Sequence, residues 1–167
     1  RWTVNKVTTE SKMRRTLRAE FFTDKHAVRL WSATDIDLIP TAEEPLHSFL
    51  SRLGPDVLHE DVDEEVLYNQ LKSKKCFRKK GATLMLDQRS FAGLGNYLRS
   101  EILFAANIHP DDRPCDLSDS VPRNWAQAIK QVTVQAYETG GVTVPSDVAK
   151  AGKQRGEPRR TWRHYAF

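Results

Sequence analysis

Cysteine is scarce in this sequence, which holds only Cys76 and Cys115 among 167 residues. Two cysteines are too few for a disulfide framework, and they lack the paired spacing of a structural zinc site, so we expect two free thiols. Long apolar runs are missing as well, which argues against a membrane-spanning helix. The opening Arg1-Trp2-Thr3-Val4 is polar and strand-like and shows no secretory pattern. These absences favour a cytoplasmic globular protein without membrane association, and we expect a monomer.

Positive charge is in small excess. The sequence has 26 Lys and Arg residues and 22 Asp and Glu residues, which gives a net charge of +4. The distribution is more informative than the sum. Acidic residues cluster at 60–65, whereas basic residues gather at 72–80 and again at 150–163. Such segregation suits a protein with one face turned to nucleic-acid phosphates. A solvated basic loop and a disordered tail would account for the same charges equally well.

The first forty residues carry a β pattern. Leu17, Ala19 and Phe21 alternate with other residues and would share one face of a strand. A turn at Asp24-Lys25 would join this strand to a second one at 26–32, which predicts a hairpin. Because an isolated hairpin is unstable in water, the region needs further strands, and the sequence that follows does not supply them.

After these forty residues the apolar period becomes helical. Asp63 is placed to cap one helix, and Gly54-Pro55 and Gly140-Gly141 are stop signals after two others. The predicted helices cover residues 45–53, 64–72, 83–91, a stretch beginning at 96, and 118 or 119 to about 139. Beyond Pro145 the chain is polar and basic, and we expect it to be mobile or held only by nucleic acid.

The most informative segment surrounds Gly93-Leu94-Gly95-Asn96. Glycines on both sides of Leu94 allow positive φ angles and a close approach of the backbone to a ligand. Asn96 at the N-cap of a helix would present its amide beside free N–H groups at the positive end of the helix dipole. This arrangement suits a DNA phosphate, although a simple helix-capping glycine turn has the same short pattern.

Several motifs in a fixed order make this segment more specific. Residues 48–58 (SFLSRLGPDVL), 86–88 (LDQ) and 92–97 (AGLGNY) resemble the helix-two-turn-helix domain of the formamidopyrimidine-DNA glycosylase and endonuclease VIII family. The order and spacing of that family hold over effectively the whole chain. Residues 30–38 (LWSATDIDL) resemble the endonuclease VIII branch, because the Asp-Pro-Arg-Arg-Phe-Gly type of sequence typical of the other branch is missing.

The resemblance implies an α+β fold, in which part of an N-terminal β-sandwich precedes an all-α helix-two-turn-helix DNA-binding domain. We accordingly expect residues 1–40 to be the C-terminal part of the catalytic β-sandwich domain and residues 41–144 to be the DNA-binding domain. Residues 145–167 would be a basic segment leading to a zinc finger beyond the chain. Zinc is therefore expected in the full-length family enzyme, whereas no metal and no other cofactor is expected in this chain.

The resemblance also implies base-excision repair by a DNA glycosylase with AP lyase activity. Family members flip a damaged nucleotide out of the duplex, an N-terminal proline amine attacks the sugar, and β,δ-elimination nicks the strand. The branch points to oxidised pyrimidines, to duplex DNA with a damaged base or an abasic site as the partner, and to a bacterial nucleoid-associated location. Because Arg1-Trp2 matches a strand inside the first domain, we expect DNA-binding residues in this chain and no catalytic ones.

Two DNA contacts of the family carry over by position. Arg52 matches the arginine after Phe-Leu-x, and Asn96 matches the asparagine of Gly-Leu-Gly-Asn, so both are expected at phosphates near the lesion. Without the motif, Arg52 would be interpreted as a surface arginine lying along its helix. Charge and placement add Lys79, Lys80 and Arg99 as further DNA-binding candidates.

Three functions stay open from the residues alone. The chain is part of a glycosylase/AP lyase, or a non-catalytic DNA-binding module with the helix-two-turn-helix fold, or an unrelated nucleic-acid binder such as the ribosomal and topoisomerase proteins with this motif. The β segment before Pro40 argues against the third, because it too matches the glycosylases. Arg89 and Glu101 are interpreted as an internal pair of the helical domain.

Overall fold

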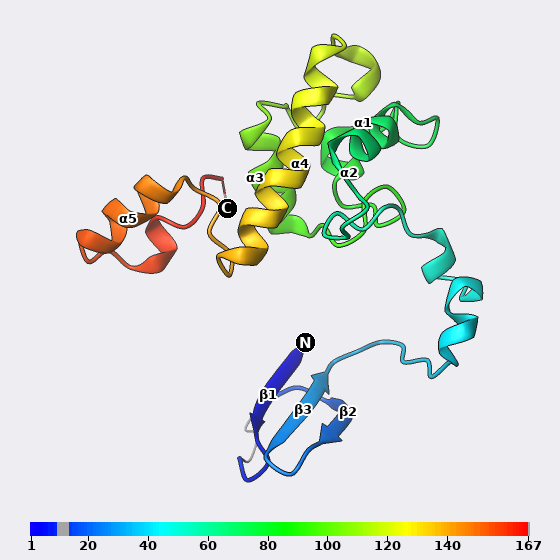
Figure 1. The fold of residues 1–167 in the computed structure, drawn as a ribbon, viewed down its shortest axis with the longest axis vertical. Coiled ribbons are helices and arrows are strands. Elements are labelled where there is room, and N and C mark those ends of the chain that lie inside the picture. The colour runs from blue at the N-terminus through cyan, green and yellow to red at the C-terminus, as the bar shows by residue number, and fades with distance from the viewer. Residues whose placement is uncertain (10–13, 167) are drawn as a thin grey trace. The chain divides into compact units, whose positions relative to one another are not determined.

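The computed structural model describes residues 1–9 and 14–166. Its contacts divide the chain into two units, residues 1–45 and residues 46–167. The predicted domains also include 10–13 and 167, and those parts of the prediction lie outside the described residues. The first unit holds a sheet and the second holds the α-helices (Figure 1), which confirms the predicted α+β class. None of the described helices has the length and apolar character needed to cross a membrane.

A three-stranded antiparallel sheet forms the first unit. Its strands are paired in the order β1-β3-β2, with bounds β1 (Trp2–Lys6), β2 (Leu17–Phe22) and β3 (His26–Trp31). The pairing of β2 with β3 confirms the predicted hairpin, and a bulge between Leu17 and Ala19 shifts its register. β1 pairs with the other edge of β3, where Val4 lies opposite Val28. The hairpin thus gains a third strand from the sequence before it.

The two faces of this sheet differ in character. On one face the rings of Trp2 and Phe21 lie 6.3 Å apart, and both side chains are exposed. On the other face Arg29 is buried, and the indole Nε1 of Trp31 donates to Thr3 Oγ1 over 2.9 Å. The alternation of side chains along each strand therefore separates an apolar face from a face with internal polar partners.

Two short 3₁₀ helices follow, η1 (Thr41–Leu46) and η2 (Leu50–Arg52), and the α-helix predicted over 45–53 is wrong. Neither element buries a side chain, so tertiary packing gives no support to a longer helix. Pro45 also removes one main-chain donor. The His47 imidazole Nδ1 accepts main-chain N–H groups that an α-helix would have used internally.

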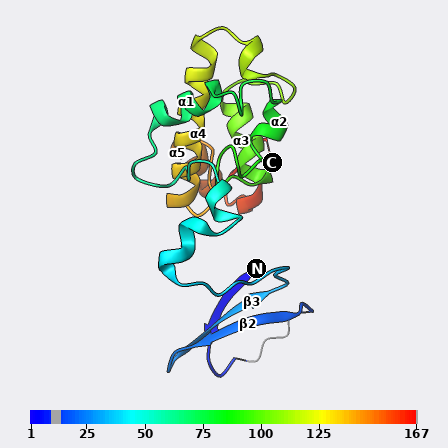
Figure 2. The ribbon, with the colours of Figure 1, turned by 90° about the vertical axis from the view of Figure 1, so that its right-hand side faces the viewer.

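Helices pack around one hydrophobic core in the second unit. In chain order the elements there are α1 (Glu64–Lys72), α2 (Gly81–Leu84), α3 (Asn96–Ala105), the 3₁₀ helix η3 (Pro114–Asp116) and α4 (Ser120–Glu138). Helix α4 packs against both α1 and α3 (Figure 1 and Figure 2). The largest buried side chains are Trp125, Phe91, Leu67, Leu71 and Leu84. α1 begins as predicted, because Asp63 Oδ1 accepts the Val66 N–H over 2.8 Å.

The helix predicted over 83–91 is also wrong, because α2 ends at Leu84. Asp87 redirects the chain instead. Its Oδ1 accepts the Arg89 N–H over 3.0 Å, and its carbonyl oxygen accepts the Ser90 N–H over 2.7 Å. An aspartate side chain that bonds to nearby main-chain groups favours such turns over a helix.

Residues 146–166 are folded, which corrects the prediction of a mobile basic segment. Helix α5 (Ser146–Gln154) and the 3₁₀ helix η4 (Arg159–Thr161) contact each other and enclose a small core. That core consists of Val142, Val144, Ala149 and Trp162. Too few apolar residues contribute to it for a periodic signal to show in the sequence.

Candidate nucleic-acid interface

The loop between α2 and α3 contains a turn that one side chain holds closed. Gly93 has a φ of 87°, in the left-handed region that favours glycine. Gln88 Oε1 accepts the Gly93 N–H over 3.0 Å, and Gln88 Nε2 donates to the Leu94 carbonyl over 2.7 Å. We call residues 88–96 the clamped turn. Gln88 was missed as a site residue, although the Leu-Asp-Gln motif that contains it was recognised.

The clamped turn leads directly into the N-terminus of α3. Asn96 is the first residue of this helix and is exposed, whereas Gly95 occupies the N-cap with φ −115° and ψ 179°. The prediction of Asn96 as the N-cap is therefore off by one residue. The first main-chain bond of the helix runs from the Arg99 N–H to the Gly95 carbonyl over 2.9 Å. The first N–H groups of an α-helix point out of its N-terminal end, which in general favours an anion there.

The segment after η2 packs against the clamped turn. The Gly54 N–H donates to the Gln88 carbonyl over 2.9 Å, and the Ala92 N–H donates to the Pro55 carbonyl over 2.9 Å. A Cβ at position 54 would lie only 2.4 Å from the Ser90 carbonyl oxygen. Only glycine allows this approach, so two stretches on either side of α1 form one framework.

Arg52 ends η2 just before that segment and is exposed. Its Nε donates to the Ser48 carbonyl over 2.5 Å. This bond uses one of the five N–H donors of a guanidinium and orients the group along the chain. The structure thus brings the arginine of the Phe-Leu-x-Arg motif and the asparagine of the Gly-Leu-Gly-Asn motif onto a shared framework.

The three candidates chosen from charge are placed differently. Lys79 is half-buried behind the clamped turn, with its Nζ 2.6 Å from Asp87 Oδ2. The hydrogen bond from Lys79 holds the pKa of the Asp87 carboxyl below its usual value. Lys80 Nζ lies 2.8 Å from Asp111 Oδ1. Arg99 lies on α3 and lines a hollow beside this helix. Both lysines therefore have an internal carboxylate partner.

A buried carboxylate fixes α3 from another side. Glu101 is 1% exposed, and its oxygens accept the Tyr165 N–H over 2.9 Å, the Ala166 N–H over 2.7 Å and the Thr143 hydroxyl over 2.5 Å. These partners replace the internal pair predicted between Glu101 and Arg89. The helix that begins at the clamped turn is thereby joined to the last described residues of the chain.

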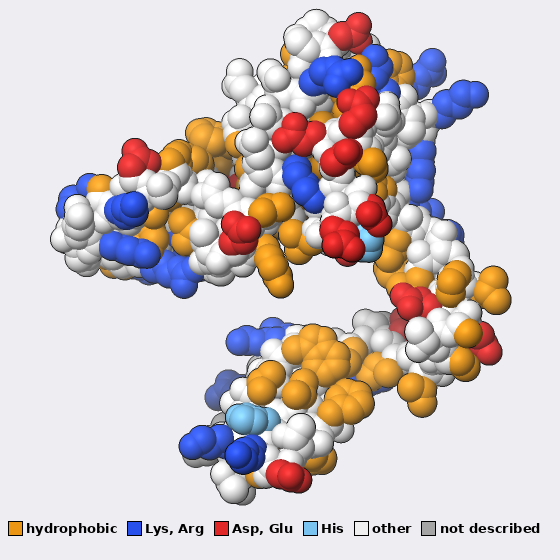
Figure 3. Space-filling model, viewed as in Figure 1, with side chains coloured by type: hydrophobic (Ala, Val, Ile, Leu, Met, Phe, Trp, Pro, Cys, Tyr) orange, Lys and Arg blue, Asp and Glu red, His pale blue; other side chains and the backbone are white. Residues whose placement is uncertain are grey.

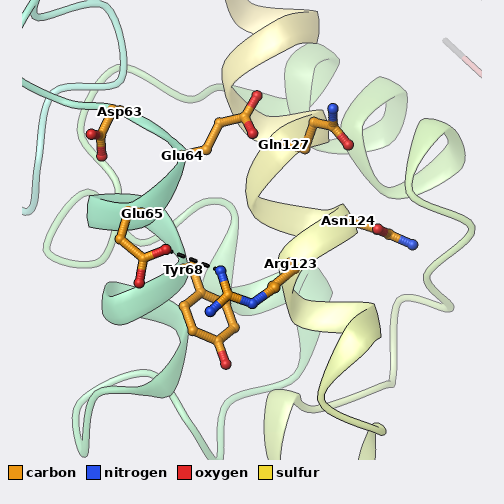
Figure 4. Close-up of a pocket in the computed structure, with 7 residues that line it drawn as sticks. All are labelled: Asp63, Glu64, Glu65, Tyr68, Arg123, Asn124 and Gln127. Atoms are coloured by element: carbon orange, nitrogen blue, oxygen red, sulfur yellow. Dashed lines mark hydrogen bonds and ion pairs between the residues drawn. The ribbon is translucent and has the colours of Figure 1, made fainter.

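A groove of about 410 Å³ between α1 and α4 has an acidic lining (Figure 4). Glu64 and Glu65 contribute to it, and Glu65 Oε2 lies 3.0 Å from Arg123 Nη1. The Arg123 guanidinium also lies 4.1 Å from the centre of the Tyr68 ring. The one cation in the lining is thus paired internally, and carboxylates repel phosphates. This face of the helical unit is unsuited to DNA.

Within residues 1–9 and 14–166, no three His, Cys, Asp or Glu side chains come together as a metal site. Cys76 is buried and Cys115 lies on η3, and both are free thiols. The described residues therefore do not fit the zinc ion that the family resemblance implies.

Comparison with known proteins identifies the helical unit. Residues 53–147 match the family described as the formamidopyrimidine-DNA glycosylase H2TH domain, where H2TH denotes helix-two-turn-helix. The chain is 34% identical over 140 residues to endonuclease 8 of Pectobacterium carotovorum and 36% identical over 141 residues to endonuclease 8 of Klebsiella pneumoniae. These alignments cover 84% of this chain but 53% and 54% of the two relatives. The chain thus spans about half the length of the curated relatives it matches.

Solved structures share the fold at lower identity. Lactococcus lactis formamidopyrimidine-DNA glycosylase, bound to DNA with an AP site, aligns with a TM-score of 0.64 and 22% identity over 93% of this chain and 56% of that one. MutM in complex with DNA containing carbocyclic 8-oxo-G aligns with a TM-score of 0.67 and 22% identity over 84% and 53% of the two chains. Because the domain match covers more than half of the sequence, the chain belongs to the formamidopyrimidine-DNA glycosylase and endonuclease VIII family. Its similarity to the endonuclease 8 proteins places it in the endonuclease VIII branch.

Proposed function

We propose that this chain is the duplex-DNA-binding part of a base-excision repair glycosylase/AP lyase that acts on oxidised pyrimidines. The clamped turn carries the proposal, because it leads to Asn96 at the N-terminus of α3 and packs against the segment that follows Arg52. Relatives named endonuclease 8 support the branch, and the proteins that share the fold were solved with abasic or damaged DNA. The whole enzyme would work in the cytoplasm, where bacterial DNA lies.

In this proposal the chain holds the DNA backbone while the damaged nucleotide is extruded. Arg52 and Asn96 would bind phosphates near the lesion, which fixes the register of the duplex and reads no sequence. Extrusion costs a few kcal/mol of lost stacking, so firm backbone contacts help to retain the distorted duplex. Residues 1–40 would belong to the catalytic β-sandwich, residues 41–144 to the DNA-binding domain and residues 145–167 to a basic connection.

Duplex binding at several salt concentrations tests the proposal. The full chain is titrated into a fluorescent duplex with an abasic-site analogue, and anisotropy gives the dissociation constant. Arg52→Ala should weaken binding by roughly tenfold, equivalent to ~1.4 kcal/mol, and should lower the slope of log K against log salt by about 0.9. Asn96→Ala should weaken binding without changing the slope, because it removes no charge. Arg123→Ala is the matched control, since this arginine lies in the acidic groove.

The possible results distinguish a wrong assignment of Arg52 from a wrong assignment of the function. An Arg52→Ala variant with wild-type affinity and slope would remove this residue from the DNA face. A wild-type chain with no measurable duplex affinity would refute the proposed function. Borohydride trapping on abasic duplex examines the chemistry separately, because a covalent adduct with this chain would assign it a nucleophile and contradict a role limited to binding.

A further inference from the structure

The net positive charge of the chain is concentrated in one short segment. Residues 146–163 hold six Lys and Arg residues against two acidic ones, whereas the rest of the sequence is balanced with 20 of each sign. In Figure 3, Lys and Arg side chains border hydrophobic ones over the region of α5. This segment is folded around a small core of its own.

Part of this charge has partners inside the segment. Arg155 Nε lies 2.6 Å from Glu157 Oε1, and Arg159 Nη2 donates to the Gly140 carbonyl over 2.7 Å, at the C-terminal end of α4. Lys150 and Lys153 are exposed. These two lysines lie one turn apart on α5, so their ammonium groups share one side of the helix.

A groove lies between the end of α4 and α5, and we call it the α5 groove. Its volume is about 590 Å³, and its lining includes the apolar Val142, Val144 and Ala149 together with Lys150 and Lys153. Among the described residues that line it, none is acidic. The groove therefore combines an apolar floor with positive charge, in contrast to the acidic groove between α1 and α4.

Hydrogen bonds fix the walls of the α5 groove. Gln135 Nε2 donates to the Val144 carbonyl over 2.7 Å, and Thr139 Oγ1 donates to the Val142 carbonyl over 2.9 Å. Gln135 lies on α4, Thr139 is the C-cap residue of this helix, and both acceptors lie in the connection to α5. Because these two side chains hold the connection in place, the groove does not depend on the ordering of a loop by a ligand.

The last turns of α4 lie between the α5 groove and the clamped turn. Gln135 and Thr139 line the α5 groove, whereas Ala136 and Tyr137 line a hollow of about 230 Å³ together with Gly93 of the clamped turn. Tyr137 is 74% exposed. A single stretch of α4 thus connects the predicted phosphate site to the positively charged groove, with an exposed aromatic ring on it.

We propose that the α5 groove binds the sugar–phosphate backbone of the DNA strand that continues beyond the Asn96 site. Lys150 and Lys153 would neutralise phosphates, and the apolar floor would contact deoxyribose. Charge complementarity selects this occupant, because the segment holds the whole net charge of the chain and the groove has no acidic lining residue. The inference rests on the proposed function and extends the DNA contact surface across the end of α4.

The test compares double variants of the full chain in the same salt titration. Lys150→Ala/Lys153→Ala should lower the slope of log K against log salt by about 1.8, because each phosphate contact contributes about 0.9. Lys150→Arg/Lys153→Arg should restore the slope. Lys72→Ala/Arg123→Ala is the matched control, because it removes two positive charges from exposed ion pairs elsewhere on the helical unit. Progressive shortening of the duplex should weaken the wild type before it weakens the lysine variant.

Each outcome bears on one proposal or on both. A lowered slope in the lysine variant, with an unchanged control, supports the α5 groove. A wild-type slope in the lysine variant, or an equal loss in the control, overturns it. If Arg52→Ala still lowers the slope in that case, the proposed function stands without the groove. If the wild-type chain binds no duplex, both proposals fail together.

Discussion

The contact between Gly152 and Trp162 makes a prediction whose sign opposes the usual rule for helices. Gly152 lies inside α5 and is buried, and a Cβ there would lie 2.5 Å from Trp162 Cγ. In an open helix, Gly→Ala stabilises by about 1 kcal/mol. Here the indole, which is 7% exposed, would have to move. We therefore expect Gly152→Ala to destabilise the α5 segment.

The magnitude follows from the burial of the tryptophan. Complete loss of a buried indole would cost about 4–6 kcal/mol, from roughly 150–250 Å² at about 25 cal/mol per Å². Partial displacement, offset by the gain in helix propensity, leaves an expected net cost of about 2 kcal/mol. Such a cost raises the population of the opened segment roughly 30-fold. Because α5 has its own small core, the opening is expected to be local.

Limited trypsin digestion measures this opening, because α5 contains Lys150 and Lys153. Cleavage at these sites should accelerate roughly 30-fold in Gly152→Ala when opening is fast relative to cleavage. Ala151→Gly is the control, with a loss of helix propensity of about 1 kcal/mol and no new contact with the indole. Trp162→Leu opens the segment by itself, but adding Gly152→Ala to that variant should accelerate cleavage much less than it does in the wild type, because the clash with the indole is gone. Cleavage of Gly152→Ala at or below the wild-type rate would refute the packing argument.

Two further predictions concern buried or half-buried carboxylates. Glu101→Gln should lower the free energy of unfolding by about 2 kcal/mol, because an amide cannot accept all three donors that the carboxylate accepts. Thermal unfolding, with Glu138→Gln as the control, and amide exchange at residues 165–166 measure this loss. Equal unfolding midpoints for Glu101→Gln and the wild type would contradict it. The pKa of the Asp87 carboxyl lies below its usual 3.8 because Lys79 donates a hydrogen bond to it. The pair therefore stabilises the fold fully above pH 3.8, and this contribution is lost as the pH falls through the lowered pKa. Urea unfolding should therefore show a shallower acid dependence for Asp87→Asn than for the wild type, and identical acid profiles would exclude the pair as a source of stability.

Helices whose ends are set by neighbouring residues were predictable from the sequence. α1 begins and ends at the predicted residues, because Asp63 caps it through a bond to a main-chain N–H three residues away. α4 ends just before Gly140 and Gly141, which both have positive φ angles. In these cases the signal and the structure it determines lie within one helical turn, so periodicity and capping suffice.

Structure that depends on distant partners was not predictable in this way. The helix predicted at 45–53 is replaced by two 3₁₀ helices, and the helix predicted at 83–91 gives way after Leu84 to a turn held by Asp87. Gly54, which follows the first segment, donates its N–H to the Gln88 carbonyl of the second. In the candidate site, too, some residues were predictable from the sequence and others were not. Arg52 and Asn96 were proposed from motif resemblance, whereas Gln88 was missed because its amide acts on residues of a turn that exists only in the folded chain.

The close approach of Gly54 to the Ser90 carbonyl has a consequence for how the clamped turn could arise and change in evolution. Gly54 and Pro55, which precede α1, supply main-chain contacts to the turn, so the short motif alone does not determine its structure. A peptide of residues 86–97 grafted onto another scaffold would keep Gly93 and Gly95 and lose the contacts with Gly54 and Pro55 that position them. Conversely, the α1 region between these two stretches can vary in length or in its exposed side chains without altering the turn, provided that Gly54 and Pro55 still contact it. Variation at position 54 would instead disturb the clamped turn, and with it the proposed phosphate site, although Gly54 is not one of the proposed phosphate contacts.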